Sequence, residues 1–597
     1  MKIRLPKTLL TLVAIAATST AQAGYISPTT IWTEGGEMEL GTNPKNVPGY
    51  TIDVKDGDNE ATISKDVETS SGLFVREGTL VIGNQDDHIT VEINPIRENG
   101  NEDCQLEYIG GTPEVLNVAG KNSVVVIDNA TVTSDKEAVT AVGGPDGNGT
   151  LIIQNGGIYD GSKQLHLMIG YKSYALEGEN PDETKGTYEG KIVKQQLLHA
   201  TTNNIGDSRV DYDNRYVGTY TEGIGGTEFG RGEVTVTGEG SLLKSGRLGF
   251  HMAEGEVNIL NNATFHITYA KPRNEQESCV TSIGYGIGCT SVVNVKDGAV
   301  WNIDNQLQTG QGDNSKTIIN VENATVNLNN LKGAFLGMGS DPERDNSYVE
   351  NGSTTEFNLL EGARLNVSEE LYIGYVSSAK MTVAKTAVIK DFGNLHTEGT
   401  AYVPETPAQE IKLPGSPIDR LIIDKSGILE NAGTIDMMTE LSGGIFTMVD
   451  GAVAKSLTAI TGTINLSGNV TFTGEVKLGS LAMAAAEGET VSPLTINIEQ
   501  GTTLIFEDQV ALGNAVINVL LSDEDYEGEQ LFTIASVDGL IPDALKDIDL
   551  QLRFNGSTVN TVAMSAGHVA TKTIPEPTTA TLSLLALAGL AARRRRH

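Results

Sequence analysis

The feature that most constrains the fold is a repeated pattern of alternating apolar and polar residues, broken each time by a tight turn. Five segments show it most clearly: VVVIDNATVTS (124–134), VNILNNATFHI (257–267), VVNVKDGAVWNI (292–303), IINVENATVNL (318–328) and FNLLEGARLNV (357–367). Alternation with a period of two residues is typical of strands that bury one face. The pattern therefore predicts an all-β chain.

The residues at the centre of each repeat indicate where the chain must change direction. Asparagine and glycine adopt a positive φ more readily than other residues, so they mark tight turns. We expect turns at Asn129, Asn262, Gly298, Asn323 and Gly362.

The spacing of these turns distinguishes two all-β architectures. Several successive turns recur roughly every 25 residues, a period within the range of solenoid repeats. An Ile-Gly or Leu-Gly pair precedes three of them at a nearly constant separation, with Gly249, Gly284 and Gly374 before the turns at Asn262, Gly298 and Thr386. Short strands at such a period, without helical periodicity, favour an elongated parallel β-helix, or β-solenoid, whose coils bury a continuous core by stacking. A hairpin-based all-β fold remains the alternative, because Asp-Asn and Asp-Gly turns also join antiparallel strands.

Two segments interrupt the repeats and suggest a domain organisation. We expect solenoid repeats over residues 24–400, a proline-rich joint at 401–420, and a second β segment with a terminal cap at 421–573. The first segment contains a polar excursion, residues 171–231, that is rich in tyrosine. Its tyrosines are Tyr171, Tyr174, Tyr188, Tyr212, Tyr216 and Tyr220.

The N-terminal segment, residues 1–23, has the three zones of a secretory signal peptide. Lys2, Arg4 and Lys7 form a basic start, an apolar stretch follows from Leu9 to Ala17, and Ala21 and Ala23 stand at the positions that signal peptidase requires. The apolar stretch is too short to remain as a membrane span. We expect export through the Sec translocon and a mature chain that begins at Gly24.

The C-terminal segment, residues 574–597, also has three parts in a fixed order. Pro575, Glu576 and Pro577 precede the apolar stretch Thr578–Ala592, and the basic cluster Arg593, Arg594, Arg595 and Arg596 follows. A helix over the apolar stretch would extend about 22 Å, shorter than a hydrocarbon core of about 30 Å, so it would thin the bilayer locally. The arginines act as a stop-transfer signal that holds the C-terminus in the cytoplasm.

This tail resembles the PEP-CTERM sorting signal of Gram-negative bacteria, also called an ice-binding protein C-terminal domain. The resemblance implies an exosortase-type sorting enzyme as partner, transient anchoring in the inner membrane, and final placement at the cell surface or outside the cell. The degenerate repeats of the body are similar to the strand repeats of autotransporter-type passengers. Ice binding is not expected, because the threonine pairs Thr131/Thr133 and Thr235/Thr237 are isolated.

The charge of the body excludes one class of partner. Residues 24–577 carry 35 Lys and Arg against 77 Asp and Glu, a net charge of −42. A body so acidic is repelled by phosphate backbones, so nucleic acid is not an expected partner.

Cysteines and metal ligands are few. Cys279 and Cys289 are a candidate disulfide in an oxidising compartment, which would leave Cys104 single. Ca²⁺ is a candidate ligand of three oxygen-rich segments, 56–60, 144–149 and 341–346, although none matches an EF-hand. We predict no other cofactor and no metal-ligand set.

The sequence contains no catalytic motif, and we therefore predict a structural or adhesive surface protein rather than an enzyme. Acid pairs such as Asp56/Asp58 and Asp211/Asp213 are expected by chance in so acidic a chain, and His251 and His266 flank a turn. A glycan-binding protein is the first alternative, with Tyr174, Tyr188, Tyr212, Tyr216 and Tyr220 as candidate sugar contacts. A β-helix polysaccharide lyase or hydrolase is the second alternative. A concave row of acids with an arginine in the folded structure would favour it, and a surface lined by Asn, Thr and Val would count against it.

Cleavage of the signal peptide is directly testable. Mass spectrometry of the exported protein should find Gly24 at the N-terminus, because the small residues at Ala21 and Ala23 fit the signal peptidase site. Surface-located protein that retains Met1 would contradict the prediction.

Overall fold

The computed structural model describes residues 30–563 with gaps, the longer of which are 41–48, 55–59, 96–113, 178–186, 199–230, 269–279, 341–347, 392–418, 480–493, 521–531 and 537–548. For the strands within 172–198 and 532–563 it describes the backbone alone. The chain divides into two units. Unit 1 comprises Met1–Ile319 with Gly339–Ser353, and unit 2 comprises Asn320–Met338 with Thr354–His597.

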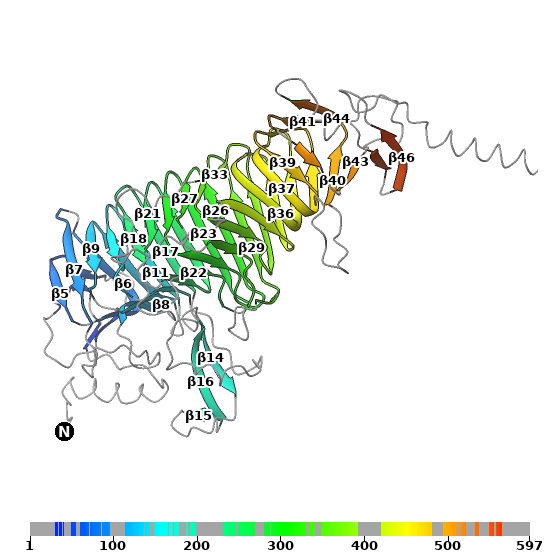
Figure 1. Cartoon of the computed structure of the whole chain (residues 1–597). Coiled ribbons are helices and arrows are strands. Elements are labelled where there is room, and N and C mark those ends of the chain that lie inside the picture. Colours follow the sequence, from blue (N-terminus) through cyan, green and yellow to red (C-terminus); the bar gives the residue numbers. More distant parts are fainter. Residues whose placement is uncertain are drawn as a thin grey trace, which may run out of the picture. The chain divides into compact units, whose positions relative to one another are not determined.

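In unit 1 the strands form three parallel ladders, and the chain visits them in turn (Figure 1). Ladder A contains β2 (Gly36–Glu37), β4 (Ala61–Ile63), the second halves of β6 (Gly72–Gly83) and β8 (Glu114–Asp128), β11 (Gly149–Gln154), β17 (Gly232–Thr237), β20 (Gly255–Leu260) and β23 (Thr290–Lys296). Ladder B contains β5 (Val67–Thr69), β7 (Ile89–Ile93), β9 (Ala130–Thr133), β12 (Ile158–Asp160), β18 (Leu242–Ser245), β21 (Thr264–Ile267) and β24 (Val300–Ile303). Ladder C contains β1 (Thr30–Trp32), β3 (Gly49–Asp53), the first halves of β6 and β8, β10 (Val139–Val142), β13 (His166–Ile169), β19 (Gly249–Met252), β22 (Val280–Ile283) and β25 (Gln306–Thr309).

Unit 2 has the same three-ladder organisation, and the boundary between the units falls within β26 (Lys316–Glu322). Ladder A of unit 2 contains β29 (Thr354–Leu359), β32 (Ser378–Val383), β35 (Gly427–Asn431), the ends of β36 (Thr434–Met448) and β37 (Val453–Leu466), β40 (Leu494–Glu499), β43 (Ala515–Leu520) and β45 (Asp549–Phe554). Ladder B contains β27 (Thr325–Leu328), β30 (Arg364–Val367), β33 (Val388–Asp391), the starts of β36 and β37, β38 (Asn469–Phe472), β41 (Thr502–Phe506) and β44 (Phe532–Ser536). Ladder C contains β28 (Ala334–Leu336), β31 (Glu370–Ile373), β34 (Arg420–Asp424), the middles of β36 and β37, β39 (Val476–Leu478) and β42 (Val510–Leu512).

This arrangement confirms the prediction of an all-β body with parallel strands, and it is consistent with the predicted β-solenoid. No helix occurs among the residues that the structure describes. The hairpin alternative does not account for the ladders, whose pairings are parallel; antiparallel pairing is seen between β45 and β46 (Ser557–Ala563) and in a separate small sheet.

Alternating burial in the strands explains why the ladders stack. In β20 every second side chain is buried and its neighbours are partly exposed. Leu151, Val234, Val257 and Val293 occupy one register position of ladder A in four successive strands, and all four are fully buried. Each inward residue thus packs on its counterpart one strand away, and the apolar core is continuous within the unit.

Outward positions of ladder A carry rows of asparagine. The Nδ2 atom of Asn294 donates a hydrogen bond to Oδ1 of Asn258 at 2.9 Å in unit 1. In unit 2, Asn497 donates to Asn465 and Asn518 to Asn497, each at 2.9 Å. An amide both donates and accepts, so identical side chains on neighbouring strands satisfy one another along the stack.

The predicted turns are confirmed in detail. Asn129, Asn262, Gly298, Asn323 and Gly362 all have positive φ, at 49°, 62°, 80°, 46° and 68°. At Gly298 the turn also passes close to the preceding coil, because a Cβ atom there would lie 2.1 Å from Oδ1 of Asn262.

The two interrupting segments leave the ladders intact. Strand β17 pairs with β11 across the tyrosine-rich excursion, from which β14 (Lys172–Glu177), β15 (Thr187–Tyr188) and β16 (Lys191–Leu198) form the separate antiparallel sheet. Residues 401–418 of the predicted joint lie outside the described part of the chain. Strand β34, which begins at Arg420, pairs with β31. A joint in the stack therefore stays a prediction.

The core of unit 1 provides a test of the stacking. Trp301 is fully buried on ladder B and stacks on Phe265 of the neighbouring strand, with ring centroids 6.3 Å apart and ring planes at 9°. Trp301→Ala should destabilise the chain by about 3–5 kcal/mol, because it removes a large buried ring and leaves a cavity. Denaturant unfolding followed by circular dichroism measures the loss.

Thr264→Ala is the matched control, since Thr264 lies on the outer side of the strand that carries Phe265. It should change the stability by no more than about 1 kcal/mol. Equal effects of the two substitutions would contradict the assigned inner and outer faces.

Candidate functional site

Most of the residues that the sequence singles out lie outside the described part of the chain. These are the signal residues Ala21, Ala23 and Gly24, the motif Pro575–Pro577, the cluster Arg593–Arg596, and Tyr212, Tyr216 and Tyr220. The backbone of Tyr174 belongs to β14 and that of Tyr188 to β15, and both strands pair with β16. The structure does not describe their side chains, so their role as sugar contacts stays a prediction.

The candidate disulfide also stays a prediction. Cys289 is buried in unit 1, whereas Cys279 and Cys104 lie outside the described residues.

No group of three or more His, Cys, Asp or Glu side chains in the described ranges is placed to hold a metal ion. The segments proposed for Ca²⁺ lie mostly in the gaps, so that proposal is neither supported nor contradicted.

The described histidines make contacts with neighbouring side chains. Nε2 of His251 lies 2.9 Å from Nδ1 of the buried His166, and Nε2 of His266 lies 2.6 Å from an Asp304 oxygen.

One buried tyrosine has a strongly shifted pKa but lies in the core. The Tyr159 hydroxyl bonds to the side chains of Thr140 and Gln164. Burial raises the pKa of Tyr159 to about 12. The phenol therefore remains protonated at neutral pH and fills a polar niche between two ladders rather than acting as a base.

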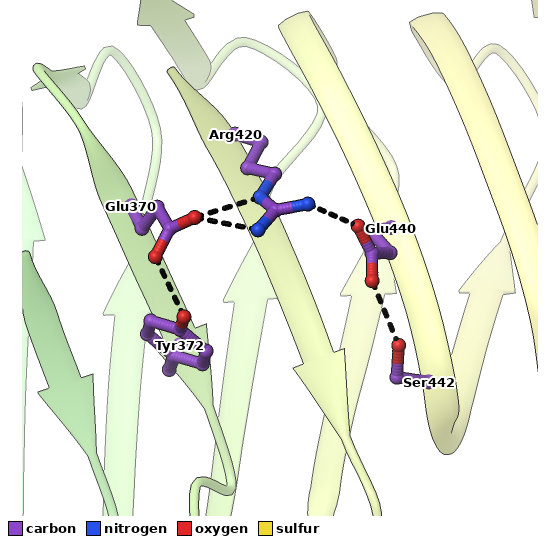
Figure 2. A network of polar contacts seen from close by, with 5 residues as sticks. All are labelled: Glu370, Tyr372, Arg420, Glu440 and Ser442. Carbon is purple, nitrogen blue, oxygen red and sulfur yellow. Dashed lines mark hydrogen bonds and ion pairs between the residues drawn. The ribbon is translucent and has the colours of Figure 1, made fainter. Parts of the chain in front are cut away.

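Sequence reasoning missed the most developed polar site, which lies on the outer side of ladder C in unit 2 (Figure 2). We call it the Arg420 cluster; its members are Glu370, Tyr372, Arg420, Glu440 and Ser442. They come from β31, β34 and the middle of β36, which are neighbours in the ladder. All point outward, because alternate residues such as Leu371, Leu421 and Leu441 are fully buried.

Arg420 is the centre of this cluster. Its Nε and Nη2 atoms donate to Oε1 of Glu370 at 2.9 and 2.6 Å, and Nη1 donates to Oε2 of Glu440 at 2.6 Å. The Tyr372 hydroxyl donates to the other Glu370 oxygen at 2.6 Å, and the Ser442 hydroxyl donates to Glu440 at 3.0 Å. The side chains remain partly exposed, at 32% for Arg420, 21% for Glu370 and 18% for Glu440.

The surroundings of Arg420 and Tyr372 raise the pKa of both side chains. Burial lowers the pKa of Arg420, but the hydrogen bond to Glu370 and the charge of Glu440 outweigh it, and the pKa is raised. The pKa of the Tyr372 phenol is raised by burial and by its hydrogen bond to Glu370. At neutral pH the guanidinium is charged and the phenol is neutral, so this tyrosine is a hydrogen-bond donor and not a base.

Tyr372 also belongs to a group of three aromatic rings, which we call the aromatic cluster; the other two are Phe335 and Tyr375. In this aromatic cluster, Phe335 stacks on Tyr372 with centroids 4.9 Å apart and planes at 7°. Tyr375 meets both edge to face, at 4.9 and 5.3 Å. All three rings are half-buried and lie outside the apolar core.

Additional carboxyls lie at the end of the same strands. The backbone N–H of Glu369 donates to Oδ1 of Asp419 at 2.7 Å. Burial and a hydrogen bond with Asp391 raise the pKa of Asp419, and burial with the charges of Asp419 and Glu370 raises that of Glu369. Acids gathered so closely give this edge of the site a negative potential.

A comparison with known protein families, with characterised proteins and with solved structures finds no match for this chain. The described residues contain no helix with the length and apolar character that a membrane span requires.

The acidic edge predicts a pH-dependent stability. Asp419→Asn should raise the melting temperature of the full chain at about pH 7. Because the pKa of Asp419 is raised on folding, the folded state loses stability as the pH rises from the unfolded pKa of about 3.9 through the folded value. At about pH 3 the carboxyl is protonated in both states, and the difference should vanish. Thermal unfolding at both pH values checks this.

Asp450→Asn is the control with the opposite sign. Hydrogen bonds from the backbone and side chain of Asn469 lower the pKa of Asp450. Its ionised form therefore stabilises the folded state above the unfolded pKa, and the substitution should lower the melting temperature at about pH 7. A rise in both variants would show that removing any carboxylate stabilises this acidic chain, and it would refute the specific role of Asp419.

Proposed function

We propose that this chain is an exported structural or adhesive protein of the bacterial cell surface or extracellular matrix, whose body is a β-solenoid. Export would use the N-terminal signal peptide and the Sec translocon. Sorting would use the PEP-CTERM-like tail and an exosortase-type enzyme, after transient anchoring in the inner membrane.

The observation that carries this proposal is the continuous parallel pairing of the ladders within each unit, in which the register shifts locally between a few strands such as β34 and β36. Apolar columns such as Leu151, Val234, Val257 and Val293 fill the interior, and asparagine rows run along the outside. Such a stack is stiff, because every coil is fixed by main-chain hydrogen bonds to its neighbours. It suits a protein that spans distance or displays surface in the envelope, and its acidic character keeps it soluble there.

A row of acids with an arginine does occur, at the Arg420 cluster, but its chemistry argues against a polysaccharide lyase or hydrolase. Glycosidases need one carboxyl that is protonated and one that is ionised. Glu370 and Glu440 instead share one cation, because both accept hydrogen bonds from the Arg420 guanidinium. Tyr372 and Ser442 donate to the other oxygens of the same two carboxyls, so the cluster is organised as a hydrogen-bonding surface.

Glycan binding is the second candidate function, and a specific observation favours it. The aromatic cluster and the Arg420 cluster are adjacent and partly exposed on the same side of ladder C.

The sorting proposal makes a testable prediction about the tail. In a Gram-negative host with an exosortase, replacing Pro575, Glu576 and Pro577 with Ala should leave the chain anchored and uncut, because an extended segment that a protease can grip is lost. Replacing the four arginines with Ser should let the chain pass through the membrane unprocessed, since four charges would no longer have to cross the bilayer. Cell fractionation and mass spectrometry distinguish the two products.

The matched control replaces His597, which adjoins the arginines, with Ser. It should be processed as the wild type is. If both tail variants reach the surface with the wild-type mass, the sorting proposal is wrong.

A further inference from the structure

We propose that the Arg420 cluster and the aromatic cluster together form a binding surface for a neutral, hydroxyl-rich polysaccharide. The proposal rests on the proposed extracellular function and gives the glycan-binding alternative a definite site. It also moves that site from the tyrosine-rich excursion, where the sequence placed it, to the outer side of ladder C in unit 2.

The aromatic cluster supplies the apolar half of the surface. Phe335, Tyr372 and Tyr375 are half-buried and contact one another outside the core. Aromatic rings offer flat apolar surface, which suits the apolar C–H face of a pyranose ring. These rings lie apart from the inward columns that form the core.

The Arg420 cluster supplies the polar half. The guanidinium has five N–H donors, of which three are donated to Glu370 and Glu440. Each carboxylate has about four acceptor positions; Glu440 accepts one hydrogen bond from Arg420 and one from Ser442. Donors and acceptors therefore remain side by side, as a pair of neighbouring sugar hydroxyls requires.

The backbone holds the two halves at fixed spacing. Phe335 is in register with Tyr372, and Tyr372 with Ile422, so the surface extends over successive strands about 4.8 Å apart. Because the strands belong to the stack, little ordering is needed when a chain-like ligand binds along them. A linear polymer fits such a surface better than an isolated small molecule does.

Charge selects among polysaccharides. The site contains Glu370 and Glu440 with Arg420, and Glu369, Asp391 and Asp419 lie at its edge. Five carboxylates and one guanidinium repel uronates and sulfated polymers. A cationic polymer would bind anywhere on a chain of net charge −35, without dependence on this site. A neutral polysaccharide is the ligand that these particular side chains can recognise.

A purely structural role is the competing explanation. Ile422 lies between Tyr372 and Glu440 in register and is 4% exposed, so the two clusters also shield it. The test therefore uses substitutions that keep apolar or polar cover while removing the recognising groups: Phe335→Leu and Arg420→Gln. Lys380→Ala is the control, because the exposed Lys380–Glu430 ion pair lies on ladder A of the same unit.

The experiment is affinity electrophoresis of the purified full chain and its variants. The gels contain hydroxyethylcellulose, galactomannan, xyloglucan or dextran as neutral polymers, polygalacturonate as the anionic polymer and chitosan as the cationic one. At least one neutral polymer should retard the wild type and Lys380→Ala equally. Phe335→Leu and Arg420→Gln should each weaken that binding about tenfold, and the effect should persist at high salt. Melting temperatures near that of the wild type show that the variants are folded.

Three outcomes would overturn the proposal: no retardation by any neutral polymer, retardation that folded Phe335→Leu and Arg420→Gln retain in full, or binding to chitosan or polygalacturonate alone. If either variant is unfolded, Glu440→Gln and Tyr372→Phe take its place in the same comparison. Processing of the tail does not involve these residues. Failure of this test therefore leaves the sorting proposal standing, and failure of the tail variants leaves the binding result standing.

Discussion

In-register stacking of identical positions on parallel strands is the interaction on which the rest of the structure depends. Main-chain hydrogen bonds place each residue directly beside its counterpart one coil away. A side chain therefore packs mainly on its own kind: Val257 on Val234, Phe265 beside Trp301, Asn497 on Asn465. The inward columns exclude water, and the outward columns satisfy one another's polar groups. The register that forms the core also places the outward polar and aromatic side chains of neighbouring strands side by side.

The Arg420 cluster shows how this stacking generates a site without a local motif. Glu370, Arg420 and Glu440 lie on three neighbouring strands. Arg420 is in register with Glu370, and its side chain also reaches Glu440, which lies two positions along β36 from its register partner Met438. Removing one charged side chain from this partly buried row would leave the remaining charges without an ion-pair partner. The protein has 77 acidic and 42 basic residues, so carboxylates on its surface repel one another. An arginine between two glutamates offsets that repulsion locally.

The fold could be predicted from the sequence to a large extent, because its signals are local. Alternation over 257–267 fixes which side chains face inward, and Asn129 or Asn323 fixes where the chain turns. The site could not be predicted, because its partners are distant: Arg420 is 50 residues from Glu370, with the proline-rich segment between them. Which residues of β31 and β34 become neighbours depends on the length of the segment between the two strands. The sequence alone does not reveal that pairing. The tyrosines of 171–231 attracted a functional interpretation because they are close in sequence, which is a weaker criterion than closeness in the ladder.

The excursions between strands have a consequence for how such a protein can change. Hydrogen-bonded neighbours on adjacent coils are 18 residues apart at Asn465 and Thr447, and 85 residues apart at Gly156 and Ser241. The strands on either side of the inserted residues pair with the neighbouring coil in both cases. Each doubling of a flexible loop adds only about 0.6 kcal/mol of closure entropy, so growth from the shorter to the longer separation costs on the order of 1 kcal/mol. That is about the net contribution of one hydrogen bond. A lineage carrying this fold can therefore acquire a segment the size of a small domain at a turn without redesigning the core.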